Sequence, residues 1–142
     1  MVIEQIGGGQ VHRCLKMKDK YIQHLDDDER SILVDGGTEP PFTGKYDDFY
    51  LDGVYVCKSC ESQLFYSNSK FKSGCGWPSF DDVIDDSVVK KRDCSLGRIR
   101  TEVICRKCEG HLGHVFEGEN YTEKNTRYCV NSLSLKFISK EK

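Results

Sequence analysis

Short apolar runs separated by glycine and proline dominate this 142-residue chain after Thr38. These runs are rich in Val, Ile, Tyr and Phe, which is typical of strands bounded by turns. Within them, residues 132–138 alternate polar and apolar side chains, as a half-buried strand does. The pattern predicts six strands, at residues 54–57, 64–66, 88–91, 99–104, 112–116 and 128–138.

The region before Thr38 has a different texture, because residues 15–34 follow a partly helical pattern. Asp26 is a candidate N-cap, Glu29 follows three residues later as in a capping box, and Gly36 and Gly37 end the helix. Three consecutive glycines at 7–9 favour mobility over about the first ten residues. We therefore expect a mainly β fold of antiparallel sheets with short N-terminal helices.

Length and charge narrow the class of protein. The chain fits one domain, and its formal net charge of −2 disfavours nucleic-acid binding, which relies on a basic excess. The basic run Lys90, Lys91 and Arg92 is interpreted as a solvated strand or loop edge. Apolar runs are too short for a membrane helix, and the start lacks the features of a signal peptide, so we expect an intracellular protein.

Eight cysteines are the most informative feature of the composition. Four of them form two C-x-x-C pairs, Cys57 with Cys60 and Cys105 with Cys108, and each pair is followed by Glu and a small residue. Two such turns can direct four sulfurs at one point, as in a tetrahedral zinc site with Zn–S distances of ~2.3 Å. Two separate dithiol or disulfide pairs are the alternative. A closed four-thiolate site stabilises a fold and leaves no position open for a substrate.

The other cysteines are Cys14, Cys75, Cys94 and Cys129. For Cys14 we expect a bystander in the tail, and Cys94 lies in a predicted exposed turn, where it is a bystander or a reserve redox residue. Cys129 shares a predicted strand face with Arg127 and Asn131. Arg127 would lower the pKa of the Cys129 thiol and favour the reactive thiolate. The residues alone leave open whether Cys129 is a nucleophile or a buried thiol.

Two further segments carry candidate chemistry. His111 and His114 point to opposite faces of a regular strand, unless a bulge at Gly113 re-aims one ring. Either histidine is a candidate proton donor, because imidazole titrates near neutral pH. The segment GCGWPSF, at 74–80, contains Trp77, which either fills the core or forms an aromatic wall beside Cys75.

These segments together resemble a known family. The sequences GTEPPFTG at 37–44, GCGWPSF at 74–80, HLGHVF at 111–116 and RYCVNS at 127–132 are similar, in the same order, to the motifs of B-type methionine sulfoxide reductases. The two C-x-x-C pairs resemble those of the zinc-containing members. Two departures stand out, because Leu133 replaces a usually small residue and residues 117–119 replace a proline-containing turn.

The resemblance implies a reduction of methionine-R-sulfoxide in peptides or proteins. Cys129 would be the nucleophile, Cys75 the resolving cysteine, and His111 or His114 the proton donor. Trp77 and Asn131 would bind the substrate. The cycle would pass through a sulfenic acid and a disulfide, which thioredoxin would reduce. The zinc would be structural, bound by the four cysteines of the C-x-x-C pairs.

The resemblance also implies a fold of two antiparallel sheets, with residues 1–36 as an extension and 37–142 as the catalytic domain. We further expect a cytoplasmic monomer, with no nucleic-acid or membrane partner, that repairs oxidised proteins during oxidative stress. Two rival interpretations are a zinc-ribbon-like binding module and a different thiol oxidoreductase such as a peroxide reductase. The first leaves Cys75, Trp77 and Cys129 unexplained, and the second has no use for an aromatic methyl pocket.

Overall fold

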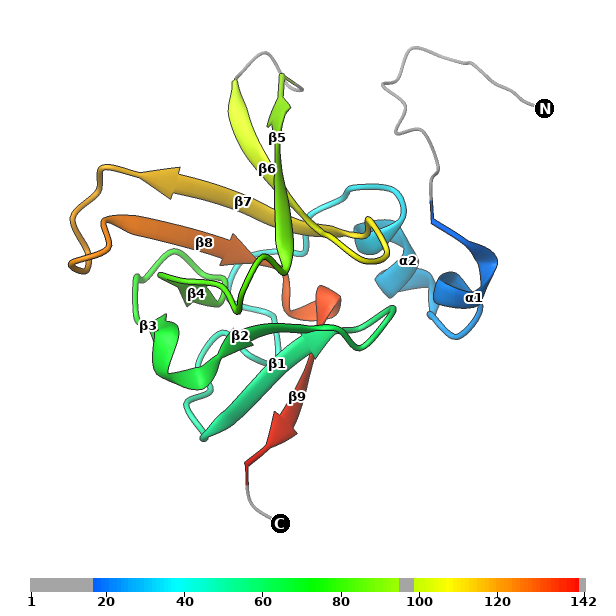
Figure 1. The fold of residues 1–142 in the computed structure, drawn as a ribbon, viewed down its shortest axis with the longest axis horizontal. Helices are drawn as coiled ribbons and strands as arrows, with labels where there is room; N and C mark the ends of the chain where they lie inside the picture. The colour runs from blue at the N-terminus through cyan, green and yellow to red at the C-terminus, as the bar shows by residue number, and fades with distance from the viewer. Residues whose placement is uncertain (1–16, 95–98, 141–142) are drawn as a thin grey trace.

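The computed structural model describes residues 17–94 and 99–140. Its strands form two antiparallel sheets, which confirms the mainly β fold predicted from the sequence (Figure 1). The smaller sheet has the order β2-β1-β9, and the larger one has the order β3-β4-β8-β7-β6-β5. The bounds are β1 Gly53–Cys57, β2 Gln63–Tyr66, β3 Lys70–Phe71, β4 Ser79–Phe80, β5 Val88–Asp93, β6 Arg100–Cys105, β7 His111–Glu117, β8 Thr126–Val130 and β9 Leu135–Ser139.

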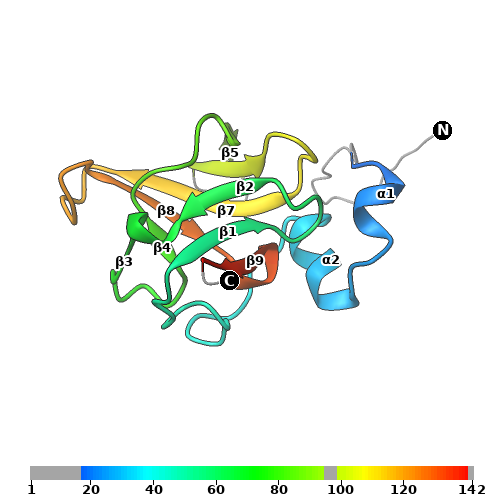
Figure 2. The same cartoon turned by 60° about the horizontal axis from the view of Figure 1, so that its bottom comes forward.

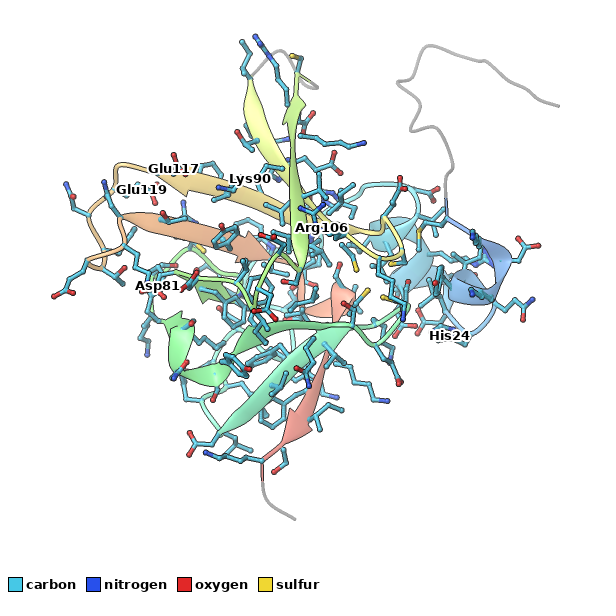
Figure 3. All side chains as sticks on the ribbon, viewed as in Figure 1. His24, Asp81, Lys90, Arg106, Glu117 and Glu119 are labelled. Atoms are coloured by element: carbon cyan, nitrogen blue, oxygen red, sulfur yellow. The ribbon has the colours of Figure 1, made fainter. Side chains whose placement is uncertain are left out.

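Strand β5 forms one edge of the larger sheet and carries the basic run. Lys90, Lys91 and Arg92 are all exposed, as the solvated-edge interpretation predicted. The Lys90 ammonium lies 3.7 Å from the Glu117 carboxylate at the end of β7, and Figure 3 shows the two side chains on neighbouring parts of the sheet. Charged side chains on an edge strand oppose pairing with another sheet, so this edge is protected.

The two helices, α1 (Asp19–Ile22) and α2 (Asp27–Leu33), are short and lie together at one end of the molecule (Figures 1 and 2). The predicted cap of α2 is confirmed, because Asp26 accepts from the Glu29 amide at 2.8 Å and Glu29 accepts from the Asp26 amide at 3.0 Å. Ile32 and Leu33 are buried in the core. Neither helix is long and apolar enough to cross a membrane. The first ten residues, predicted to be mobile, lie outside the described residues.

One strand prediction is wrong, because residues 128–138 do not form a continuous strand. The chain leaves the larger sheet after Val130, makes a 3-10 turn at Ser132–Ser134, and enters the smaller sheet as β9. Side chains bond to the backbone across this break. Asn131 donates to the Leu112 carbonyl at 3.0 Å, and Ser134 donates to the His111 carbonyl at 2.9 Å. Such bonds compete with the strand ladder and transfer the chain to the other sheet.

Aromatic rings form the part of the core that supports this region. Tyr55 of β1, Phe65 of β2 and Phe80 of β4 are fully buried, and the Phe65 and Phe80 rings stack with centroids 4.2 Å apart. Strand β4 pairs with β8 so that Ser79 lies opposite Cys129. The aromatic core therefore fixes the backbone that carries Cys129, since buried rings of this size contribute strongly to packing.

Candidate active site and metal centre

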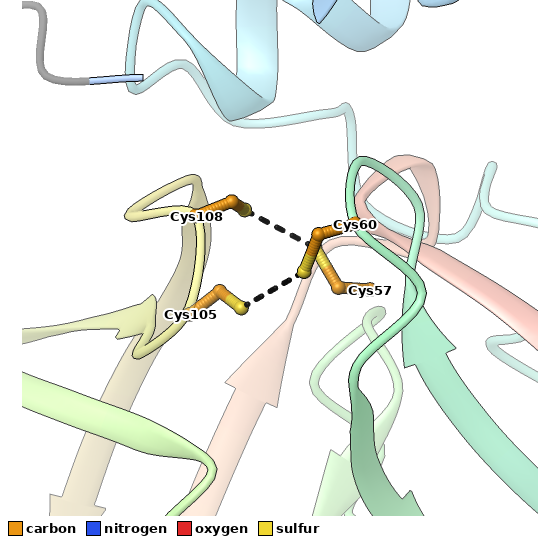
Figure 4. Close-up of side chains that lie close together, drawn as sticks. All are labelled: Cys57, Cys60, Cys105 and Cys108. Carbon is orange, nitrogen blue, oxygen red and sulfur yellow. Dashed lines mark hydrogen bonds between the residues drawn. The ribbon is translucent and has the colours of Figure 1, made fainter. Parts of the chain in front are cut away.

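Four cysteine sulfurs gather between two hairpin connections at the helical end of the molecule. Cys57 ends β1 and Cys60 lies in the β1–β2 connection, while Cys105 ends β6 and Cys108 lies in the β6–β7 connection. Their Sγ atoms all lie within 4.8 Å of one another. The Cys57–Cys108 and Cys60–Cys105 Sγ–Sγ distances are both 3.6 Å, and Figure 4 shows the two pairs facing each other.

The two connections have the same local geometry, which explains their shared sequence pattern. Glu61 and Glu109, directly after the second cysteine of each pair, have φ angles of 64° and 69°. The Glu61 amide donates to the Cys57 carbonyl at 2.8 Å, and the Glu109 amide donates to the Cys105 carbonyl at 2.9 Å. Each turn thus folds back on its first cysteine, and both sulfurs of a pair face the opposite turn.

This arrangement fits one four-coordinate metal ion. The edges of a tetrahedron with ~2.3 Å metal–sulfur bonds are about 3.8 Å long, close to the 3.6 Å separations across the cluster. A disulfide requires about 2.05 Å. Cys57, Cys105 and Cys108 are buried, so the cluster is almost closed to solvent. Four thiolates in a closed set are the donors of a structural zinc site.

A separate pocket of about 160 Å³ opens along β7 and β8. It gathers residues from both strands, from the start of β6, from the segments before β4 and β1, and from the position directly after β8. Five of the six predicted catalytic and substrate-binding residues meet there together with Arg127, while His111 is not part of the lining. The pocket is lined by Thr38, Cys75, Trp77, Arg100, Gly113, His114, Phe116, Arg127, Cys129 and Asn131.

Cys75 and Cys129 face each other in this pocket, with their Sγ atoms 3.7 Å apart. The pKa of Cys75 is lowered to about 4, first by the hydrogen bond from the Cys129 thiol and then by the Ser73 and Ser79 hydroxyls. The pKa of Cys129 is raised, because its thiol holds the shared proton beside the Cys75 thiolate and is buried. The two sulfurs therefore titrate as a pair that carries one negative charge at neutral pH.

Arg127 supplies the positive charge beside this pair, as the sequence predicted. Its guanidinium makes two bonds to the Glu119 carboxylate, at 2.8 and 3.1 Å, and lies 4.5 Å from the centre of the Phe116 ring. Figure 3 shows Glu119 in the β7–β8 connection. Arg127 acts to lower the pKa of Cys129, against the larger effects of Cys75 and burial. The thiol pair thus has a fixed cation at its edge.

The two histidines lie on one side of β7 because the strand is irregular. Val103 of β6 pairs with Gly113 and Ile104 pairs with His111, so Leu112 is an extra residue. The His111 and His114 rings consequently lie 5.5 Å apart. A bulge was predicted at Gly113, and the structure places it one residue earlier, at Leu112.

Each histidine bonds to a carboxylate. His114 Nε2 lies 2.8 Å from Asp93, and His111 Nδ1 lies 2.6 Å from Glu102. Burial lowers the pKa of His114, and the hydrogen bond to Asp93 opposes that shift. His111 is only 2% exposed, and its Nε2 has no hydrogen-bond partner among the described residues. His114 therefore borders the pocket, whereas His111 lies buried behind it.

Glu39 forms hydrogen bonds with Trp77 and Asn131, the two residues predicted to bind the substrate. Its carbonyl accepts from the Trp77 indole at 2.9 Å, and its amide donates to the Asn131 side-chain oxygen at 3.0 Å. The Glu39 carboxylate accepts from the Leu133 amide at 2.9 Å, and burial raises its pKa. Because Asn131 also donates to Leu112, its amide group is used in holding the backbone. Trp77 is fixed by its nitrogen, which leaves its ring as the surface on the pocket.

Residues Glu39, Asp93 and Glu102 were not predicted from the sequence. Glu39 lies in a motif that was quoted only for its resemblance, and Asp93 follows a basic run that was interpreted as solvated. The sequence around a single Asp or Glu does not indicate which histidine it will bond to, because that depends on how the strands pair. Cys94 is exposed, as predicted, and Cys14 lies outside the described residues.

Gly113 lies where strands β7 and β8 approach each other closely. A Cβ atom at this position would lie 1.9 Å from the Cys129 carbonyl oxygen, so no other residue fits without moving β8. His114 pairs with Cys129 in the register of β7 and β8. The glycine therefore allows the histidine and cysteine strands to meet directly. Two facing thiols, a fixed arginine and a carboxylate-bound histidine in one pocket are the kinds of group that thiol-based redox chemistry uses.

Comparison with known proteins identifies the family. The SelR domain model matches residues 25–139. A protein of Pseudomonas syringae pv. syringae named peptide methionine sulfoxide reductase MsrB is 46% identical over 124 residues, which cover 87% of this chain and 94% of the relative. A protein of the same name from Herminiimonas arsenicoxydans is 44% identical over 126 residues, covering 88% and 91%. This chain belongs to the SelR family, the B-type methionine sulfoxide reductases.

Proposed function

We propose that this protein reduces methionine-R-sulfoxide residues in oxidised peptides and proteins to methionine, and so repairs them. Family membership supports the reaction, as does the name shared by its relatives. The observation that carries the proposal is the 3.7 Å approach of Cys75 and Cys129 inside one pocket. Two thiols at that distance can store the two electrons that the reduction consumes.

Substrate binding is assigned to the aromatic part of the pocket. The Trp77 ring, held by its nitrogen on Glu39, provides an apolar wall for the methyl group of the sulfoxide. Phe116 lines the same pocket. With the methyl group against Trp77 and the sulfur facing Cys129, the oxygen of one epimer faces His114. We assign Asn131 a positioning part in binding, since it fixes the backbone of Glu39.

The first chemical step is assigned to Cys129. The Cys129 thiol passes its proton to the Cys75 thiolate, and the resulting Cys129 thiolate attacks the substrate sulfur. The oxygen accepts a proton, the sulfur–oxygen bond breaks as the hydroxyl group passes to the Cys129 sulfur, and the products are methionine and the Cys129 sulfenic acid. We assign His114 as the proton donor, because it borders the pocket and Asp93 stabilises its protonated form. His111, held by Glu102, supports His114 from behind. Arg127 favours the thiolate.

The second step regenerates the protein. The Cys75 sulfur attacks the Cys129 sulfenic acid, a disulfide forms, and water leaves. Only a small movement is needed, from 3.7 Å to the ~2.05 Å of a disulfide. A dithiol protein of the thioredoxin type would then reduce the disulfide. Cys94 and Cys14 take no part in this scheme.

We assign one zinc ion to Cys57, Cys60, Cys105 and Cys108. Zinc bound by four thiolates supplies folding energy, on the order of 10 kcal/mol in small zinc domains, and no chemistry on the substrate. The cluster joins the β1–β2 and β6–β7 connections, so it ties the smaller sheet to the larger one. A monomeric state, a cytoplasmic location and a part in the oxidative stress response stay predictions.

Separate R and S epimers of a blocked methionine sulfoxide test the proposed function. We expect turnover of the R epimer only, first with dithiothreitol and then with thioredoxin as the reductant. If zinc-loaded, folded protein turns over neither epimer, the zinc binding module becomes the better interpretation. If it reduces peroxide much faster than the R epimer, the protein is a different thiol oxidoreductase.

A further inference from the structure

Two exposed aromatic rings border the pocket without lining it. Phe42 is 68% exposed and Tyr121 is 51% exposed, and both lie in connections between elements. Each contacts a segment that itself forms the pocket wall. Exposed aromatic side chains beside a binding pocket are frequent anchors for a bound partner.

Phe42 is held against the segment that carries Cys75 and Trp77. Its amide donates to the Gly76 carbonyl at 2.7 Å. A Cβ atom on Gly76 would lie 2.7 Å from Pro41 and 3.1 Å from the Phe42 ring, so the glycine allows this close cover. Phe42 also has a φ angle of 64°, a left-handed conformation that is unfavourable for an aromatic residue. An exposed ring held at that cost points to a use at the surface.

Tyr121 borders the pocket from the β7–β8 connection. Its ring lies 6.0 Å from the Arg127 guanidinium, which lines the pocket, and 5.6 Å from the Phe71 ring. Phe42 and Tyr121 thus come from different connections, each anchored on a different wall. We call these two residues the aromatic border.

The size of the pocket limits what it encloses. Its volume of about 160 Å³ is below the roughly 300–1,000 Å³ of sites that enclose a whole drug-sized ligand. A single oxidised side chain fits such a space, and the neighbouring residues of a peptide then remain on the border. The flanking side chains of a peptide substrate therefore lie outside the pocket, on the side where the aromatic border is exposed.

We propose that the aromatic border is a binding surface for apolar side chains that flank the methionine sulfoxide in a peptide. This inference rests on the proposed function and adds a substrate preference to it. Phe42 and Tyr121 would each contact the flank on its own side of the pocket. Partial burial of one apolar side chain against an aromatic ring is expected to raise kcat/KM about fivefold.

Matched peptides measure this preference. Blocked tripeptides with the R-sulfoxide in the middle carry Leu or Ser at one flank and Ser at the other, and a blocked single residue serves as the reference. Dithiothreitol is the reductant, so no protein partner takes part. We expect the wild-type protein to prefer Leu over Ser by about fivefold at each flank. Equal rates for the peptides, with the reference substrate turned over, would overturn the inference and leave the proposed function intact.

Variants assign the effect to the two rings. Phe42→Asn suits a left-handed backbone and removes the ring, whereas Phe42→Tyr keeps the ring. Phe42→Asn should abolish the preference at one flank and Tyr121→Ser at the other, while Phe42→Tyr and Tyr121→Phe retain it. Tyr66→Ser, which changes an exposed ring on the smaller sheet, is the control.

Three other outcomes have defined meanings. A preference that survives in both Phe42→Asn and Tyr121→Ser contradicts the proposal. If Phe42→Asn and Tyr121→Ser lose activity only when thioredoxin is the reductant, the aromatic border is a docking surface for the reductant. That result also contradicts the proposal. If the wild-type protein reduces neither the peptides nor the reference, the proposed function fails and this inference fails with it.

Discussion

The four-cysteine cluster and the two-cysteine pocket use the same side chain in opposite ways. In the cluster each sulfur faces sulfurs of the opposite turn, three of the four residues are buried, and the geometry fits a metal ion. In the pocket Cys75 and Cys129 face each other, with Arg127 and open space beside them. The neighbours of a cysteine, rather than the residue itself, separate a structural role from a reactive one.

The largest effect expected is that of Cys129→Ser. Without the nucleophile, R-sulfoxide reduction with dithiothreitol should fall at least ~10⁴-fold, as when a catalytic nucleophile is removed. Methionine formation measures the loss, and zinc content should stay the same. Cys94→Ser, at an exposed position, is the matched control and should keep full activity. A Cys129→Ser protein with a tenth of the normal activity would show that Cys129 is not the nucleophile.

Cys57→Ser changes the four-cysteine cluster and should lower the stability of the fold. Removing one of four thiolates weakens zinc binding, and because zinc binding contributes to folding, the free energy of unfolding should fall by on the order of 3–5 kcal/mol. Zinc per chain and urea unfolding measure this. Cys75→Ser serves as the control, since it should change neither quantity much. Unchanged metal content and stability in Cys57→Ser would show that the cluster holds no structural metal.

Cys75→Ser should separate the two steps of the cycle. The variant should still reduce one sulfoxide per chain, because Cys129 remains, but thioredoxin-supported turnover should fall on the order of 10²-fold without the disulfide. A single-turnover assay and a steady-state assay give the two numbers. If thioredoxin-supported turnover stays normal, another cysteine resolves the sulfenic acid, and the double variant with Cys94→Ser would identify it.

The smallest expected effect is on the pH dependence of thiol alkylation, which should differ between the Cys75–Cys129 pair and an ordinary thiol. The pKa of Cys75 is lowered to about 4, below the ordinary thiol value near 8.5. The pair should therefore keep one thiolate from pH 9 down to about pH 5 and lose it as the pH falls through 4. Iodoacetamide labelling followed by peptide mass analysis measures the rate at which the thiols of this pair are alkylated at each pH. A rate that drops between pH 9 and 7, as for glutathione, would contradict the shared proton.

The sequence predicted the metal cluster better than the details of the pocket. A C-x-x-C pair constrains its own turn, so the meeting of Cys57, Cys60, Cys105 and Cys108 followed from local spacing. The pocket depends on strand register, and for that reason the carboxylates of Asp93 and Glu102 could not be matched to their histidines beforehand. The resemblance supplied Cys75 and Trp77, which the residues alone left open.

The break after β8 shows why part of the fold escaped prediction. Alternation over residues 132–138 favoured a strand, but hydrogen bonds from Asn131 and Ser134 to distant carbonyls turn the chain into the other sheet. Their partners, Leu112 and His111, are about twenty positions earlier in the chain. A pattern of polar and apolar residues contains no information on such long-range partners.

Disulfide mapping after oxidation by substrate tests the different roles of the two groups most directly. The zinc-loaded protein is given an excess of R-sulfoxide peptide without reductant, then alkylated, digested and analysed by mass spectrometry. We expect one methionine formed per chain, one disulfide between Cys75 and Cys129, and four cluster cysteines that keep their metal. A disulfide within the cluster, or methionine formed without a Cys75–Cys129 bond, would contradict it.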